Sequence, residues 1–205
     1  MYSALLLWVS GALAGVLHFA PQSVVTFHNG STLGDFSGSA QIAGFVDPVA
    51  RRGALDIPTA SLSTGGGPRD ARMLAYCLEA ARFPTIHFAL TTITGDVAAL
   101  KAGDPSGTVT LVGALTIRDV TRTVSVPAAF VYDAVGLKLS GRYDLLWADF
   151  GVPDPSVVIA TLAPEMYVSF DLVATAPAAP TAPTAPTGAA PAGSASGDAT
   201  PGARP

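Results

Sequence analysis

The chain is poor in cysteine and in charged residues. Its 205 residues include one cysteine, Cys77, which excludes a disulfide bond within the chain. Only 13% of the residues are charged, about half of the roughly 25% that is usual for globular domains. The net charge is −4, and Arg51-Arg52 is the only adjacent basic pair. Without a basic stripe to neutralise phosphates, nucleic acid is excluded as a partner.

Charge is also missing from the first 34 residues, where no Asp, Glu, Lys or Arg precedes Asp35. Residues 1–17 form an apolar run that resembles the hydrophobic part of a secretory signal, although its usual basic start is absent. A truncated signal peptide over residues 1–14, cleaved after Ala14, is the favoured interpretation. An uncleaved anchor and a buried core segment are the alternatives, and an anchor needs about 20 apolar residues.

The last part of the chain, residues 175–205, has no aromatic or large aliphatic side chain. Such a segment cannot bury a core, and we expect a disordered Pro/Ala/Thr-rich tail. Pro177, Pro180, Pro183 and Pro186 recur every three residues, which matches the period of a polyproline II helix. The tail is therefore expected to begin as an extended spacer.

Between these ends, residues 15–174 form one domain in which the dominant hydrophobic period is two. This alternation is typical of strands with one buried face. It is clearest in four runs, which cover residues 108–117, 123–132, 137–145 and 166–172. Shorter candidates are Val24 to His28, Gln41 to Val46, Ala54 to Leu62 and Thr85 to Ile93.

Turn residues separate the predicted strands. They occur at Asn29-Gly30, Asp47-Pro48, residues 104–107, residues 133–136 and residues 153–155. Short links between strands of period two indicate hairpins, and hence an antiparallel sheet. About eight such strands avoid exposed edges by closing into a barrel or by pairing two sheets in a sandwich.

One segment, residues 68–82, breaks the strand pattern and predicts a helix. It begins with Pro68, carries Asp70 in its first turn and ends before Phe83-Pro84. Its apolar residues recur at spacings of three and four, which gives the helix one apolar stripe. We expect this helix to cover one end of the β domain.

Motifs for catalysis or metal binding are not evident. Gly65-Gly66-Gly67 lacks the Lys-Ser/Thr of a phosphate-binding loop, and no strand-borne nucleophile elbow is present. His18, His28 and His87 lack metal-ligand spacing. We therefore expect no catalytic residue, no metal and no cofactor, and we expect Cys77 to be a small buried side chain.

Apolar surface is what remains as a functional feature. The predicted inward faces carry the small residues Gly113, Ala128 and Gly141 among large ones. Such positions either admit a crossing helix or leave a lumen. The lumen of an eight-stranded barrel has room for one small ligand, which here would be hydrocarbon-like.

Several segments in a fixed order resemble one known family. They are HFAPQSVVTFHNGSTLGDFSG, GFVDP, LDIPTASLSTGGGPRDARML, LEAARFPTIHF, GALTIRDVTRTVSVPAAF, DFGVPDP and EMYVSFDLVA. Together they resemble the YceI-like lipid/polyisoprenoid-binding family from about Gly15 to Ala174. The chain departs from the family pattern at Ala71, where histidine is common, at Asp119, where glycine is common, and at residues 146–148.

The resemblance implies an all-β fold, a lipocalin-like antiparallel β-barrel of about eight strands with one short helix covering an end. It also implies an exported protein of the bacterial periplasm or extracellular space that binds a polyisoprenoid, quinone or fatty chain. Arg69 and Asp70 are candidates for contacting the lipid head group, with a purely local structural role as the alternative. The resemblance leaves open whether two copies form a homodimer.

We therefore expect a non-catalytic protein with a lipid-binding lumen. The residues expected to line it are Leu74, Phe83, Phe88, Leu111, Leu115, Val126, Phe130, Leu139, Tyr143, Val168 and Phe170. A barrel with a packed interior, acting as an envelope interaction or stress-response module, is the main alternative. A metal- or quinone-dependent enzyme is a third hypothesis, which nothing in the sequence requires.

Overall fold

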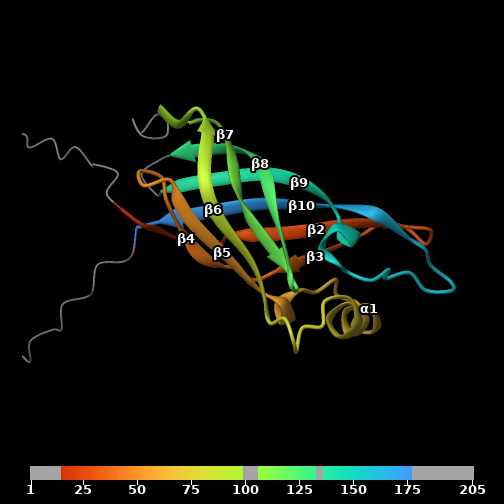
Figure 1. Ribbon diagram of the computed structural model, residues 1–205. Helices are drawn as coiled ribbons and strands as arrows, with labels where there is room; N and C mark the ends of the chain where they lie inside the picture. The colour runs from red at the N-terminus through yellow and green to blue at the C-terminus, as the bar shows by residue number, and fades with distance from the viewer. Residues whose placement is uncertain (1–14, 99–105, 133–135, 177–205) are drawn as a thin grey trace, which may run out of the picture.

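The computed structural model describes residues 15–98, 106–132 and 136–176 (Figure 1). The expected signal segment, most of the expected tail and the turns at residues 104–105 and 133–135 lie outside these ranges. The strands are β1 (Leu17–Phe19), β2 (Val24–Ser31), β3 (Phe36–Ala40), β4 (Ala43–Asp47), β5 (Arg52–Pro58), β6 (Thr85–Gly95), β7 (Ser106–Ile117), β8 (Val120–Tyr132), β9 (Leu137–Leu146) and β10 (Leu162–Thr175). The last strand thus continues one residue past the expected domain boundary.

All strand pairings are antiparallel, and the sheet closes on itself. The order is β1-β4-β5-β6-β7-β8-β9-β10-β2-β3, and a further pairing joins β1 to β10. β1 and β2 pair with successive stretches of β10. On their other side, β4 pairs with β1 and β3 pairs with β2. β1 and β2 therefore act together as one interrupted strand, and β3 and β4 act together as another. Counted in this way, the molecule is a closed eight-stranded barrel, and the predicted barrel fold is confirmed.

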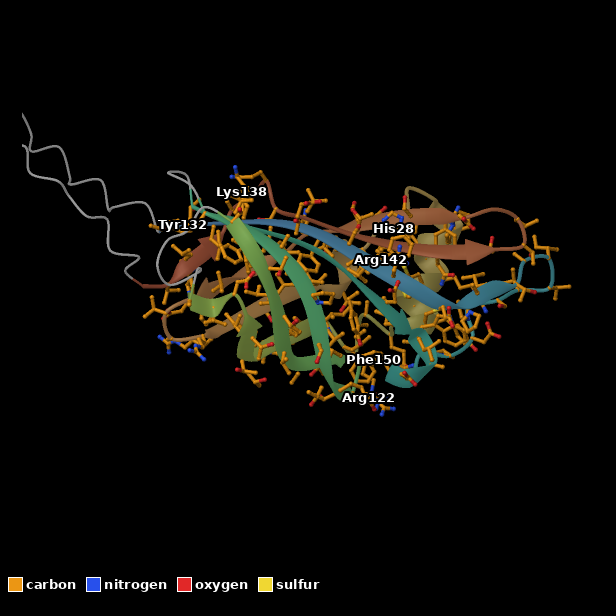
Figure 2. The ribbon with its side chains drawn as sticks, turned by 90° about the horizontal axis from the view of Figure 1, so that it is seen from above. His28, Arg122, Tyr132, Lys138, Arg142 and Phe150 are labelled. Atoms are coloured by element: carbon orange, nitrogen blue, oxygen red, sulfur yellow. The ribbon has the colours of Figure 1, made fainter. Side chains whose placement is uncertain are left out.

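The barrel is elongated, and its two ends differ. Tyr132 and Arg122 lie near opposite ends of the long strand β8 (Figure 2). The end near β1 and β4 holds a packed core of Val46, Ile93, Val109, Phe130, Leu137 and Ala174 among others. The other end is covered by helix α1 (Gly67–Arg72) and by the loops around it (Figure 1).

The helical segment is shorter than the sequence predicts. After α1, a π-helical turn covers Met73–Cys77, and Glu79 then adopts a left-handed backbone with φ of 46°. The predicted helix over residues 68–82 is therefore wrong beyond Cys77. The wider π turn also changes which side chains share a face, because its period exceeds 3.6 residues.

The tight turn predicted at Asn29-Gly30 is also wrong. Both residues lie inside β2, where Asn29 pairs with Met166 of β10 and with Phe36 of β3. The reversal comes after Ser31, and Ser31 accepts a hydrogen bond from the backbone of Leu33 and donates one to the carbonyl of Gly34. The chain therefore reverses at a turn that the Ser31 side chain stabilises, and not at Asn29-Gly30.

Small inward residues were expected either to admit a crossing helix or to leave a lumen. The structure shows that glycines on the strands make room for phenylalanine rings. Gly141 faces the ring of Phe170 on the neighbouring strand, and a Cβ atom at Gly141 would lie 2.6 Å from that ring. Gly38 pairs with Phe27 and Gly107 with Phe130 in the same way. These glycines therefore make room for cross-strand aromatic rings and not for a crossing helix.

Within the described residues, no helix is long and apolar enough to cross a bilayer.

Candidate functional site

The barrel encloses an apolar cavity of about 690 Å³. It extends from the packed core towards α1 and is lined by side chains of every part of the barrel wall. Val25, Val46, Leu139 and Leu172 belong both to the packed core and to the cavity lining, so they form the boundary between the two. The volume lies within the range of about 300–1,000 Å³ that is usual for sites of small ligands.

The strand period brings most of the predicted residues to this cavity. Its lining includes Phe88, Leu111, Leu115, Val126, Leu139, Tyr143, Val168 and Phe170. Antiparallel register places several of them side by side, since Phe88 pairs with Leu115, Leu111 with Val126 and Tyr143 with Val168. Alternation along each strand and these cross-strand pairs together produce one continuous apolar wall.

Three predicted residues do not line the cavity. Phe130 is only 1% exposed and fills the packed end, where its ring lies against Gly107. Leu74 is displaced by the π turn, and Met73, Cys77 and Leu78 line the cavity in its place. Phe83 follows the helical segment, and its ring lies below the guanidinium groups of Arg82 and Arg118, 4.8 and 5.5 Å away.

The structure adds lining residues that sequence reasoning missed. Phe27 and Met166 lie on recognised strands, and their alternation with neighbouring residues was a usable signal. Leu33, Val157 and Ala160 come from loops near the helix-covered end. Loop residues have no hydrophobic period, so nothing in the sequence pattern marked them.

The two head-group candidates have different roles in the structure. Arg69 borders the cavity, and its guanidinium carbon lies 4.5 Å from the centre of the Phe36 ring. Asp70 instead holds the loop before α1. It accepts hydrogen bonds from the hydroxyls of Ser63 and Thr64, at 2.7 and 2.6 Å, and from the backbone of Thr64 at 2.9 Å. These bonds, the Thr64 hydroxyl foremost, lower the pKa of Asp70.

Two titratable groups on the cavity wall are kept neutral by their surroundings. Burial raises the pKa of the Cys77 thiol above its usual value. Burial, and then the negative charge of Asp149, raise the pKa of the Tyr143 hydroxyl. Both groups are therefore protonated at neutral pH, so neither adds a negative charge to the cavity wall.

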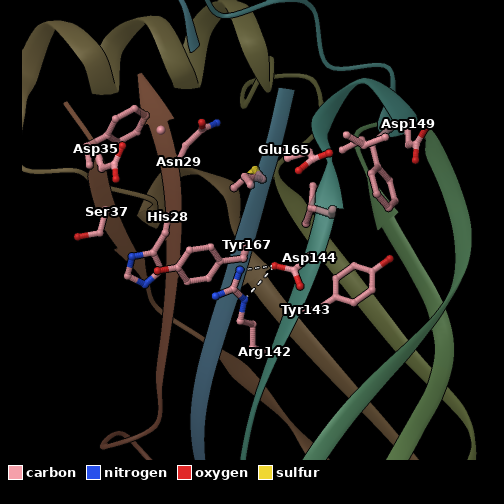
Figure 3. Close-up of a pocket in the computed structure, with 16 residues that line it drawn as sticks. His28, Asn29, Asp35, Ser37, Arg142, Tyr143, Asp144, Asp149, Glu165 and Tyr167 are labelled. Atoms are coloured by element: carbon pink, nitrogen blue, oxygen red, sulfur yellow. Dashed lines mark hydrogen bonds and ion pairs between the residues drawn. The ribbon is translucent and has the colours of Figure 1, made fainter. Parts of the chain in front are cut away.

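A second hollow lies on the outer surface of β2, β9 and β10 (Figure 3). The rings of His28 and Tyr167 stack with centres 4.3 Å apart, and Arg142 lies 3.6 Å over the other side of Tyr167. Arg142 also donates hydrogen bonds to Asp144, as the dashed lines show. His28 and Arg142 lie on the same outer face (Figure 2). These polar groups pair with one another, which is typical of a solvated sheet surface.

A metal centre is not evident in the part of the chain that the structure describes. Within it, no three His, Cys, Asp or Glu side chains form a cluster that would hold a metal ion. His87 lies beside Asp56, with its Nδ1 atom 2.5 Å from the carboxylate, on the half-exposed surface of β5 and β6. The three histidines thus occupy separate strands.

Known structures share this architecture. The Burkholderia cenocepacia protein BcnA is 22% identical, with a TM-score of 0.60 over 75% of this chain and 96% of that one. A domain from Saccharophagus degradans, described as polyisoprenoid-binding and implicated in plant cell wall breakdown, is 18% identical. Its TM-score is 0.67 over 79% of this chain and 98% of that one. At these identities the likeness shows a shared fold.

Sequence comparison identifies the family. No curated protein sequence matches the chain at a significant level. The family model for the YceI-like domain, however, matches residues 16–174. This match covers the whole barrel from the residue before β1 to the penultimate residue of β10. The chain therefore belongs to the YceI-like domain family.

Proposed function

We propose that this protein is an exported, non-catalytic carrier that holds an isoprenoid or similar lipid chain in the barrel lumen. The observation that carries the proposal is the apolar cavity beside α1, whose wall combines aliphatic and aromatic side chains from all parts of the barrel. The similar Saccharophagus degradans structure, described as a polyisoprenoid-binding domain, supports the same chemistry. The apolar residues 1–14 support export to the periplasm or extracellular space.

The cavity also limits the length of the chain that fits inside. A volume of 690 Å³ corresponds to roughly 20 groups of the size of a water molecule, at about 30 Å³ each. A methylene group is of similar size, so the lumen accommodates a chain of about 20 carbons. Each methylene that leaves water contributes about 0.8 kcal/mol, which provides ample driving force without any polar contact.

The raised pKa values of two side chains in the cavity wall, Cys77 and Tyr143, support a non-catalytic function. A general base, or a nucleophile that no neighbouring base activates, needs a pKa near or below the working pH. Cys77 and Tyr143 have the opposite shift, because burial raises the pKa of both. Their surroundings are thus suited to an apolar ligand and not to proton transfer.

The packed core at the β1 end favours one alternative function. Phe130, Leu137 and Ala174 are at most 1% exposed there, so this part of the interior is filled without a ligand. In this second hypothesis the barrel is an envelope interaction or stress-response module that carries no stoichiometric lipid. The two hypotheses differ in what the cavity contains.

Organic extraction of freshly purified protein, followed by mass spectrometry, tests the proposal. We expect about one lipid chain per protein. Leu111→Asp places a charge in the lumen wall, and burial of an unpaired carboxylate is strongly unfavourable, so we expect little or no lipid from this variant. The matched control is Thr110→Asp, on the adjacent outward position of β7. Clean extracts from several wild-type preparations would support the packed module instead.

The single cysteine supplies an independent measurement if Leu111→Asp fails to fold. Cys77 lines the lumen and is buried, so we expect slow reaction with an uncharged thiol reagent in the native protein. Stripping the lipid should accelerate this reaction, and adding a chain of about 20 carbons should slow it again. Identical rates in the stripped and reloaded protein would show that the chain binds elsewhere.

A further inference from the structure

Two loops at the end of the molecule opposite β1 join into one structure. The loop after β2 and the loop before β10 are connected by a hydrogen bond from the backbone of Thr32 to the carbonyl of Thr161 (3.0 Å). The backbone of Thr161 in turn donates to the hydroxyl of Thr32 (3.1 Å). Figure 1 shows both loops projecting together at the far end from β4.

The side chains at this point are large, apolar and exposed. Val157 and Ala160 exchange two backbone hydrogen bonds of 2.8 and 3.0 Å, which leaves Val158 and Ile159 at the centre of a tight turn. Val158 is 106% exposed and Ile159 77%, and Leu33 on the neighbouring loop is 71% exposed. We call Leu33, Val157, Val158 and Ile159 the apolar tip. Single exposed apolar residues are common, but four on two joined loops mark an interaction site.

The apolar tip is continuous with the lumen. Leu33 and Val157 are exposed to solvent and also line the cavity, together with Ala160 and Leu162 from the same region. Apolar surface therefore extends from the interior of the barrel to its outermost residues. A lipid chain that follows this surface does not have to cross water.

The charges around the tip indicate the kind of partner. Neither residues 31–34 nor residues 155–164 contain a charged side chain. Arg72 donates hydrogen bonds to the carbonyls of Pro155 and Ser156, each 3.2 Å away, and so holds the loop to α1. The tip itself is thus uncharged and is attached to α1, and the charged residues nearest to it in the sequence are Asp35, Asp154 and Glu165 at the ends of the two loops. This uncharged apolar surface suits insertion into the hydrocarbon boundary of a bilayer, whereas a folded protein partner would need a complementary pocket and a polar rim.

We propose that the apolar tip inserts into the surface of a phospholipid bilayer and so brings the opening of the lumen to the membrane. The use of this contact for lipid exchange depends on the proposed function, but the insertion itself does not. Because the tip has no cation, its binding does not require anionic lipids and responds weakly to salt.

Flotation with neutral phosphatidylcholine vesicles tests this proposal. Wild-type protein should float with the vesicles at both low and high salt concentration. The double variant Val158→Ser/Ile159→Ser should lose about tenfold or more in vesicle partitioning, because two aliphatic side chains no longer leave water. The matched control is Val49→Ser/Val131→Ser, which changes two side chains that are 50% and 44% exposed away from the tip.

Several outcomes would overturn the proposal. They are wild-type protein that stays with the unbound fraction, a double variant that floats as well as the wild type, and binding that disappears at high salt. Self-association that the double variant abolishes would assign the tip to a contact between copies of the chain. As a second measurement, the tryptophan of Ile159→Trp should show quenching by brominated lipid tails.

Lipid extraction from the same variants distinguishes this proposal from the carrier proposal. A double variant that retains its bound lipid but does not float supports both proposals. Protein that floats through the tip but never contains lipid supports the tip and contradicts the carrier. Protein that contains lipid but does not float in any form contradicts the tip alone.

Discussion

Asp70 illustrates how one side chain stabilises the cover of the lumen. Its carboxylate accepts three hydrogen bonds from Ser63 and Thr64, and these bonds connect the loop before α1 to the helix. Ser63 also exchanges backbone hydrogen bonds with Ser39 of β3. The carboxylate thus links helix, loop and barrel wall, whereas the neighbouring Arg69 borders the cavity.

The lowered pKa of Asp70 predicts a stability effect that depends on pH. The folded state favours the ionised carboxylate, so its contribution is present at neutral pH and is lost as the pH falls below about 4 and through the folded pKa. Asp70→Asn should therefore lower the unfolding temperature at pH 7, and the difference from wild type should shrink in acid. Thermal unfolding at several pH values measures both. A difference that is constant with pH would contradict this role, and Thr64→Val should reproduce part of the loss.

Residue roles in the site were predictable where a strand supplies the direction of the side chain. Leu111 and Leu115 follow from alternation along β7, and the pairing of Leu111 with Val126 completes the wall. Leu74 lies outside the cavity lining, on a π turn that propensity does not indicate. The direction of a side chain is thus only as predictable as the backbone that carries it.

At the scale of the elements, neighbouring strands pack through pairs of a glycine on one strand and a phenylalanine on the next. Phe170 of β10 covers Gly141 of β9, and Phe27 of β2 covers Gly38 of β3. Each ring occupies the space that a side chain on the neighbouring strand would need. These pairs fix the local register, since a slip by one residue would bring the ring against a bulkier neighbour.

We expect the same substitution to have unequal effects at two glycines. In Gly141→Ala, the new methyl group would lie 2.4 Å from the carbonyl oxygen of Pro127 and 2.6 Å from the Phe170 ring. Overpacking of this kind costs about 1–3 kcal/mol. In Gly67→Ala the methyl group meets nothing within 4 Å beyond its chain neighbours, but Pro68 disfavours a helical alanine before it, so the free energy of unfolding should change little. Denaturant unfolding of both variants measures the free energies, and equal destabilisation by both would contradict the expected difference between a crowded and an open position.

The elements that sequence reasoning missed are the ones with the least periodic sequence. β1 has three residues and β3 is Phe36–Ala40, which is mostly glycine and serine. Their pairing with β10 and β2 is a tertiary effect, because neither segment has a strong strand propensity of its own. By contrast, β7, β8 and β9 were recognised from alternation alone.

At the scale of the whole molecule, the barrel combines a packed core near β1 with a cavity that extends towards α1. Alternation shows which face of a strand points inward, and the short connections indicate an antiparallel sheet. Closure of the sheet is seen in the folded structure, where β1 pairs with β10. How far the interior is filled depends on the fit of side chains from different strands. Phe130 and Phe88 both point inward, and only the folded structure shows that one fills the core and the other borders the cavity.

This division predicts unequal costs for two equal truncations. Phe130 is 1% exposed within the packed core, so Phe130→Ala should cost about 3–5 kcal/mol. Phe88 already faces the cavity on one side and has fewer partners to lose, so Phe88→Ala should cost less, about 1–3 kcal/mol in protein stripped of lipid. Equilibrium unfolding in urea measures both values. Equal losses would show that the cavity is filled by protein in solution.

The pairing of β1 with β10 determines where a label or a support can be attached to the barrel. His18 lies beside Thr175 and Phe19 beside Ala174, so both ends of the described chain leave the barrel together at the β1 end. The apolar tip is at the opposite end (Figure 1). A label or affinity handle attached to residue 15 or residue 176 is thus joined to the barrel at the β1 end, opposite the apolar tip.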